Sequence, residues 1–178
     1  FGLDARIAMA ILAALGVVVG TSIFMTIPQM QAKSLVQDIA TYRAAVGGMQ
    51  YDTKKNISDI ITGTPTAAKR FQALNDRSVI KTNDQRRWMG PYLKTRTADS
   101  TVHENFGQIS LIEAEKGDYT ATGCTANCSY WLQIDDVPEN SFEITNEEID
   151  GAAEATPKTE GKVRWSSDSI HVRLGNAL

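Results

Sequence analysis

The residues of this sequence that could do chemistry are two cysteines, two histidines and a run of acids. Cys124 and Cys128 are separated by three residues, and no second cysteine pair completes the four ligands of a structural zinc site. In an exported domain this spacing favours a small disulfide loop at the start of a strand. His103 and His171 lie far apart in the chain, which favours surface or strand residues over catalytic bases. Because the chain also carries no phosphate-binding loop, zinc-protease motif or nucleophile elbow, the sequence predicts no enzyme.

The acid-rich stretch from 135 to 150 is compatible with a calcium site. Calcium binds six to eight oxygens from carboxylates, carbonyls and amides. The candidate ligands are Asp135, Asp136, Asn140, Glu147, Glu148 and Asp150. Their spacing does not fit the EF-hand loop, so a solvated acidic loop is the favoured interpretation and calcium the alternative. No other cofactor is predicted.

Charge is distributed unevenly along the chain, although the formal net charge is only -3. Residues 69–96 carry eight bases and two acids, a net +6, whereas residues 104–160 carry thirteen acids and two bases, a net -11. Repeating subunits that dock head to tail need complementary patches of this kind. We therefore expect Arg86 and Arg87 to contact a neighbouring copy. A solvated surface is the second interpretation, and nucleic acid, with Trp88 and Tyr92 stacking on bases, the least favoured.

The first element that must position these residues is a long helix. Residues 7–32 contain no acidic or basic side chain, and about 20 apolar residues of helix suffice to cross a bilayer. Beyond Gln31, apolar residues recur at three- and four-residue spacing, which predicts an amphipathic helix with one buried stripe. We expect one helix from Leu3 to Val46, ended by Gly47 and Gly48.

Three helix breakers lie inside that predicted helix, at Gly16, Gly20 and Pro28. Glycine costs about 1 kcal/mol and proline about 3 kcal/mol relative to alanine in a helix interior. Two interpretations stay open. In one, the glycines make a close-packing face and the proline a mild kink; in the other, the segment unwinds locally so that subunits can pack and a filament can stretch.

The rest of the chain predicts short helices followed by strands. Residues 56–62 favour a short helix, and Thr64 with Pro65 favours the start of another that reaches Asn75. Alternating apolar residues predict strands at 106–114, 129–135, 162–165 and 169–174. Residues 118–127 and 135–161 are the expected long connections. This order indicates an α+β domain with an antiparallel meander packed on the amphipathic half of the first helix.

The N-terminal residues resemble those of the type IV pilin family. The resemblance rests on Phe1, on Asp4, on the apolar run 7–25 and on the string WMGPYL at 88–93. It departs from the family at the fifth position, where Ala5 replaces the usual Glu. Since the charged residues precede the apolar run, the segment does not have the shape of a secretory signal peptide. The expectation is a mature protein whose leader was removed before Phe1.

The resemblance implies a pilin-like fold and a structural role. The expected fold class is α+β, with a long N-terminal helical spine, apolar in its first half and amphipathic in its second, packed on a C-terminal antiparallel sheet. The expected domains are a transmembrane and filament-core helix at 1–28 and a globular domain at 29–178. In the family, an early acid of one subunit pairs with the N-terminal amine of another. That implies an assembly role for Phe1 and Asp4, with Arg6 meeting headgroups or a neighbouring acid.

The implied function is that of a major pilin subunit, which polymerises into a helical surface filament for adhesion, motility or DNA uptake. The implied partners are copies of the same chain, a leader peptidase and an inner-membrane assembly machine, with the membrane before assembly. The implied location is the bacterial inner membrane and then the cell surface. Two alternatives stay open: a pseudopilin of a type II secretion-like machine, and a single-span anchored binding domain that never polymerises.

Overall fold

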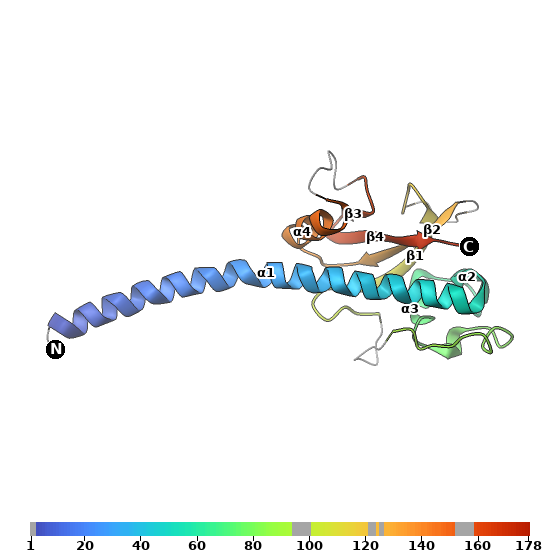
Figure 1. Ribbon diagram of the computed structural model, residues 1–178, viewed down its shortest axis with the longest axis horizontal. Helices are drawn as coiled ribbons and strands as arrows, with labels where there is room; N and C mark the ends of the chain where they lie inside the picture. Colours follow the sequence, from blue (N-terminus) through green and yellow to red (C-terminus); the bar gives the residue numbers. More distant parts are fainter. Residues whose placement is uncertain (1–2, 94–100, 121–123, 125–126, 152–158) are drawn as a thin grey trace.

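The computed structural model describes residues 3–93, 101–120, 124, 127–151 and 159–178, and within the first helix it describes the side chains of Met9 and of residues 29 onward. Helix α1 (Leu3–Thr53) dominates the molecule with 51 residues. Figure 1 shows that its first half extends away from the globular part, which packs around its second half. The buried α1 side chains Ala32, Leu35, Ile39, Val46 and Met49 follow the three- and four-residue spacing read from the sequence.

The end of α1 lies further along the chain than predicted. The helix continues through Gly47 and Gly48 to Thr53, since a glycine costs a helix interior only about 1 kcal/mol. A side chain at Gly48 would lie 3.3 Å from the Tyr92 ring, so the small residue is needed there for packing. The helix stops at Lys54, whose φ of 55° is left-handed and whose N–H donates to the Gln50 carbonyl at 2.9 Å.

The expected fold class needs a correction in its N-terminal half. The α+β class and the C-terminal antiparallel sheet are found. The apolar, membrane-crossing half of the spine is not: among the residues that the structure describes, no helix is long and apolar enough to cross a membrane. The described part of α1 from residue 29 is amphipathic instead, because exposed Lys33 and Gln37 alternate with buried Leu35 and Ile39.

The sheet has four antiparallel strands, β1 (Ile109–Glu115), β2 (Cys128–Ile134), β3 (Val163–Ser166) and β4 (Ser169–Asn176). Their positions agree with the predicted strands to within a few residues. The expected meander is wrong, because the order in space is β1-β2-β4-β3. The chain leaves β2, passes through a helix to the outer edge at β3, and returns as β4 between β2 and β3.

That helix, α4 (Glu139–Asp150), replaces the predicted acidic loop. Its buried positions Ser141, Phe142, Thr145 and Asn146 recur with helical spacing, and Gly151 at φ 92° follows its last residue. The helix contacts α1 and β3. The carboxylates between 139 and 148 therefore lie on a helix. Only one residue in four of that helix is apolar, and this is sufficient because the helix packs against α1.

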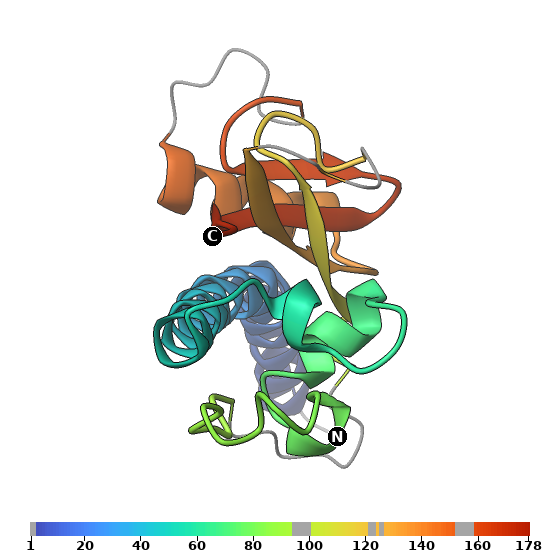
Figure 2. The ribbon, with the colours of Figure 1, turned by 90° about the vertical axis from the view of Figure 1, so that its right-hand side faces the viewer.

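Three short helical segments connect α1 to the sheet: α2 (Ile57–Ile60), α3 (Ala67–Gln72) and the 3-10 helix η1 (Arg77–Val79). The short helix predicted at 56–62 is confirmed by α2. The second helix begins later than predicted, because Thr66 and not Thr64 is its N-cap: the Thr66 hydroxyl accepts from the Lys69 N–H at 3.3 Å. In the end-on view of Figure 2, α1 lies between the sheet and the segment that follows η1.

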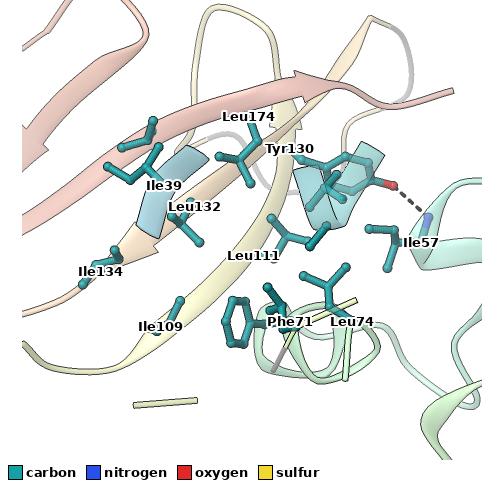
Figure 3. Packing of buried hydrophobic residues seen from close by; sticks show 14 of the residues in the cluster. Ile39, Ile57, Phe71, Leu74, Ile109, Leu111, Tyr130, Leu132, Ile134 and Leu174 are labelled. Carbon is teal, nitrogen blue, oxygen red and sulfur yellow. Dashed lines mark hydrogen bonds between the residues drawn. The ribbon is translucent and has the colours of Figure 1, made fainter. Parts of the chain in front are cut away.

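The hydrophobic core fills the space between α1, the short helices and the inner face of the sheet. Figure 3 shows Ile39 of α1 beside Leu132 and Ile134 of β2. Below Leu111 of β1 it shows Phe71 of α3 and Leu74, which follows that helix. Tyr130 is fully buried at one end of this core, where its hydroxyl accepts a hydrogen bond from the Ile57 N–H at 2.9 Å. This single bond joins β2 to the first turn of α2.

Candidate functional site

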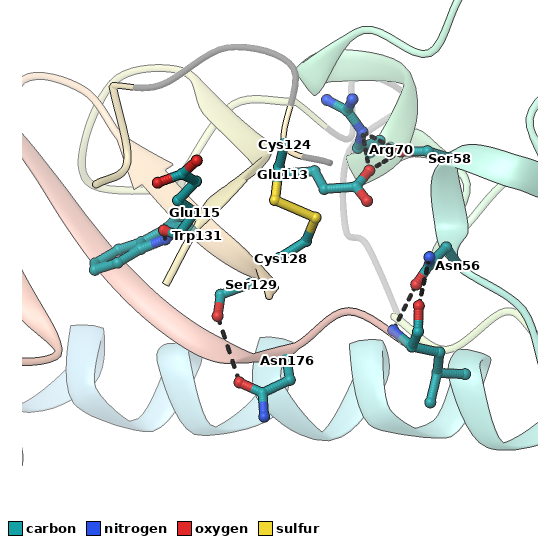
Figure 4. The surroundings of a disulfide bond; sticks show 11 residues. Asn56, Ser58, Arg70, Glu113, Glu115, Cys124, Cys128, Ser129, Trp131 and Asn176 are labelled. Atoms are coloured by element: carbon teal, nitrogen blue, oxygen red, sulfur yellow. Dashed lines mark hydrogen bonds and ion pairs between the residues drawn. A yellow bond between two sulfur atoms is a disulfide. The ribbon is translucent and has the colours of Figure 1, made fainter. Parts of the chain in front are cut away.

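The disulfide lies where β2 begins. Cys124 and Cys128 are joined, with their Cα atoms 5.7 Å apart, which confirms the expected small loop. Figure 4 shows this bond beside Glu113 of β1. Ser58 donates to the Glu113 carboxylate, Arg70 Nε donates to Ser58 Oγ at 2.7 Å, and Arg70 Nε lies 3.5 Å from Glu113 Oε2. These contacts attach α2 and α3 to the edge strand β1.

A polar pocket of about 470 Å³ opens next to the disulfide. Asn56 forms one wall, since its side chain donates to the Leu178 carbonyl at 2.7 Å and accepts from the Leu178 N–H at 2.5 Å. The lining also contains Glu113, Asp59 and Lys116. The Glu113 carboxylate is already held by Arg70 and Ser58, so this pocket offers hydrogen bonds to a polar ligand and no activated nucleophile.

Opening the disulfide is expected to weaken the domain without unfolding it. In the chain-entropy model the stabilisation grows with the length of the closed loop, and this loop is shorter than the 15-residue loop for which about 3 kcal/mol is calculated. Cys124→Ser with Cys128→Ser should therefore lower the free energy of unfolding by less than about 3 kcal/mol. Urea unfolding of the full chain measures it. A double variant that is unfolded at 25 °C contradicts the short-loop argument.

His171 lies in a stack of side chains on the outer face of the sheet, away from α1. Its ring stacks on Tyr119 at 4.0 Å between centroids, and Tyr119 contacts Trp131 at 5.7 Å. Arg164, directly across from His171 on β3, places its guanidinium 5.0 Å from the Trp131 ring. We call Tyr119, Trp131, Arg164 and His171 the outer-face stack. Burial lowers the pKa of His171 to about 4, although the Asp135 carboxylate acts to raise it. The ring is therefore neutral at physiological pH.

His103 is buried in a different place, between α1 and the loop before β1. Its Nδ1 accepts from the Asn105 N–H at 3.2 Å, and its Nε2 lies 3.3 Å from Asp38 of α1. Burial lowers the pKa of His103, although the Asp38 carboxylate acts in the opposite direction. The expected surface position is therefore wrong for His103, whereas the expected strand position holds for His171, which lies on β4. The two rings belong to separate packing clusters and do not form a catalytic pair.

The aromatic string 88–93 is fixed against both α3 and α1. The Trp88 indole donates to the Ala73 carbonyl at 2.9 Å, and the Tyr92 hydroxyl donates to Asp52 of α1 at 2.7 Å. The Gly90-Pro91 peptide bond between them is cis. The same loop is fixed a second time by the ion pair of Lys55 with Asp84, at 2.7 Å. The loop also carries Arg86 and Arg87, which were predicted to contact a neighbouring copy and are exposed.

The predicted assembly residues lie in the part of α1 that the structure describes least. Phe1 lies outside the described residues, and for Asp4 and Arg6 only the helical backbone is described. Backbone helix also runs through Gly16, Gly20 and Pro28 without a break. Local unwinding at these three positions under load stays a prediction.

The structure brings no metal ligands together in its described part. In those ranges, no group of three or more His, Cys, Asp or Glu side chains could hold a metal ion. The candidate calcium ligands are divided between the end of β2, the turn after it and helix α4, with Asp135 accepting from Gln133 and Ser169 at 2.7 and 2.8 Å. Glu147 and Glu148 are exposed on α4.

Two features of the described chain were missed by sequence reasoning. The outer-face stack joins residues from a loop and three strands, and only the aromatic content of 129–135 gave a signal for it. The ion pair of Arg70 with Glu113 was also missed, because the arginine was counted with the exposed basic segment. Comparison with family models, curated proteins and solved structures found no match to this chain.

Proposed function

We propose that this chain is a non-enzymatic structural subunit that polymerises, as a pilin does, into a helical filament. The observation that carries the proposal is the geometry of α1. Its 51 residues extend well beyond the globular part (Figure 1). Among the α1 side chains that the structure describes, the buried ones begin at Ala32. A projecting helix of this length is a natural element for contact with other molecules.

The sequence supports copies of the same chain as those partners. Residues 7–32 carry no charge, and an uncharged helix that leaves its own domain gains free energy by burial against like helices. The separate +6 and -11 segments add complementary patches, which head-to-tail subunits need. Adhesion, motility and DNA uptake are roles of the whole filament. The inner-membrane location before assembly, the leader peptidase and the assembly machine belong to the same proposal.

Electron microscopy of material sheared from the surface of producing cells tests the proposal. Long fibres whose main component is this chain are the expected result. The pseudopilin alternative predicts no long surface fibres but the same self-association. A monomer in cells and in detergent overturns both.

Replacing Asp4 is expected to cut filament yield sharply while the protein still accumulates. An unpaired charge in an apolar setting costs about 2.5 to 3.5 kcal/mol, so the N-terminal amine of one subunit should pair with Asp4 of another. Asp4→Ala removes that partner, and Asp4→Ala with Ala5→Glu should restore part of the yield. Glu160→Ala, at an exposed position, is the matched control. Normal filament yield from Asp4→Ala would show that no such pairing supports assembly.

A binding domain that never polymerises is the second candidate, and the polar pocket beside the disulfide favours it. That function predicts a stoichiometric ligand and no concentration-dependent self-association. Analytical ultracentrifugation of the full chain in detergent separates the two, since a filament subunit should associate as the detergent is diluted.

A further inference from the structure

Helix α4 carries exposed acidic side chains close to one another and near its C-terminal end, where negative charge is unfavourable. Glu143 and Glu147 are exposed and one helical turn apart, so they repel each other. Glu148 is exposed beside them, and the last turn contains no basic residue. The C-terminal end of a helix carries a partial negative charge, which disfavours acidic side chains in the last turn. We call Glu143, Glu147 and Glu148 the acidic ridge; a cationic partner would relieve both effects.

A cationic surface of the same chain lies around the C-terminal end of α1. Arg86 and Arg87 are exposed on the loop that the pairs Lys55 with Asp84 and Tyr92 with Asp52 hold against α1. Exposed Lys54 lies 3.7 Å from the ring of Tyr51. The two large hydrophobic side chains exposed in this region are Tyr51 and Met89, each 73% exposed. We call Tyr51, Lys54, Arg86, Arg87 and Met89 the basic end.

The composition of the basic end is typical of an interface. Tyrosine, methionine and arginine are enriched in protein interfaces, and tyrosine and arginine dominate their binding energy. Its fixed backbone reduces the entropy lost on docking, since two separate contacts already hold the loop. An acidic partner surface with some apolar area fits its charge and its exposed Tyr51 and Met89.

The two surfaces lie at different ends of the globular part. In Figure 1, α4 lies beside the middle of α1, whereas the loop that carries Arg86 and Arg87 follows the C-terminal end of α1 on the opposite side of that helix. The end-on view of Figure 2 gives the same opposite placement. A copy shifted along the α1 axis can therefore bring one surface to the other. Contacts between two different surfaces generate an open helical filament when the rotation between successive copies does not close into a ring.

We propose that the acidic ridge of one copy docks on the basic end of the next. This contact rests on the proposed filament function and names the surfaces that hold neighbouring globular domains together. Because the charges are exposed, salt should weaken this contact, over a screening length of about 8 Å at physiological ionic strength. The contacts between projecting helices should be much less sensitive.

Charge reversal with rescue tests the docking. Arg86→Glu with Arg87→Glu should reduce filament yield by at least about tenfold, because like charges placed in contact cost several kcal/mol. Glu143→Lys with Glu147→Lys should do the same. The four changes together restore opposite charges and should recover most of the yield. Glu115→Lys with Glu160→Lys adds the same charge as the ridge reversal at exposed positions outside it, and should assemble normally.

A cross-link identifies the contact directly. Arg87→Lys provides an amine that a carbodiimide can join to a glutamate, and the expected product links residue 87 of one copy to 143, 147 or 148 of another. Circular dichroism and urea unfolding of every variant establish that the domain is folded. If both charge-reversal variants form filaments at the wild-type yield and no such cross-link is found, the docking is overturned and the filament function still stands. If the wild-type chain forms no filament, both proposals fail together.

Discussion

Replacing Tyr130 with Ala is expected to lower the free energy of unfolding by about 3–5 kcal/mol, the range for aromatic residues deleted from a core. Tyr130 is fully buried and packs in the core beside Leu111 and Leu174 (Figure 3). Its hydroxyl is the acceptor for the Ile57 N–H, at 2.9 Å. The variant therefore loses packing and leaves a buried donor without its acceptor.

Tyr130→Phe separates these two contributions. The ring stays in the core, and the loss of the acceptor for a buried N–H should cost about 1–3 kcal/mol. The ordinary pKa of a tyrosine is about 10, and burial raises the pKa of Tyr130 further, so the hydroxyl is neutral and the result should not depend on pH between about 5 and 8. Tyr51→Phe is the matched control, because that ring is 73% exposed; its effect should stay within about 0.5 kcal/mol. Equal stability of Tyr130→Phe and the wild type would mean that Ile57 finds another acceptor.

Acid is expected to destabilise the domain through His171. Burial lowers the pKa of His171 from 6.5 to about 4 in the folded protein. The unfolded chain therefore binds a proton first as the pH falls. The stability is fully present above pH 6.5 and declines between pH 6.5 and about 4. A difference of this size corresponds to roughly 3 kcal/mol.

Burial sets the direction of this effect, because it disfavours the charged form of the His171 ring. The Asp135 carboxylate and a hydrogen bond with the Ser169 backbone act in the opposite direction. Arg164 lies directly across from His171 on β3. Tyr119 covers the ring and keeps water away. His171→Phe keeps a stackable ring that cannot titrate, so urea unfolding between pH 7 and 4 should show about 3 kcal/mol less acid loss than in the wild type. His103→Phe removes the other buried histidine, so the same measurement gives the contribution of His103 to the loss of stability in acid. Parallel pH profiles for His171→Phe and the wild type would contradict the assignment.

Local patterns in the sequence were sufficient for α1 and the four strands but not for helix α4 or for the arrangement of the elements. The buried stripe of α1 from Ala32 to Met49 and the four strands follow from spacing, because periods of 3.6 and 2 are properties of the backbone itself. The disulfide followed from compartment and spacing. The limits of the helices were less well predicted. α1 passes through Gly47 and Gly48 to Thr53, and Tyr92 packs against Gly48, a contact that no local pattern contains.

Helix α4 is the clearest case of a structure decided by tertiary contacts. Residues 139–150 contain few apolar side chains, and the sequence alone favoured an acidic loop. Phe142 becomes fully buried only because α1 and β3 supply the surface that covers it. The same contacts turn Glu143 and Glu147 outward. The acidic ridge therefore exists as a surface only in the folded chain.

Residue spacing and composition were enough to predict a long N-terminal helix, an α+β domain, a small disulfide loop and oppositely charged segments. Tertiary contacts fix the strand order β1-β2-β4-β3, the burial of both histidines and the placement of the acidic ridge and the basic end at different ends of the domain. The difference arises from the distance along the chain over which each interaction acts. Helix and strand periods arise between residues a few positions apart, whereas burial, pKa and surface charge depend on contacts such as that of Lys55 with Asp84, between residues far apart in the chain.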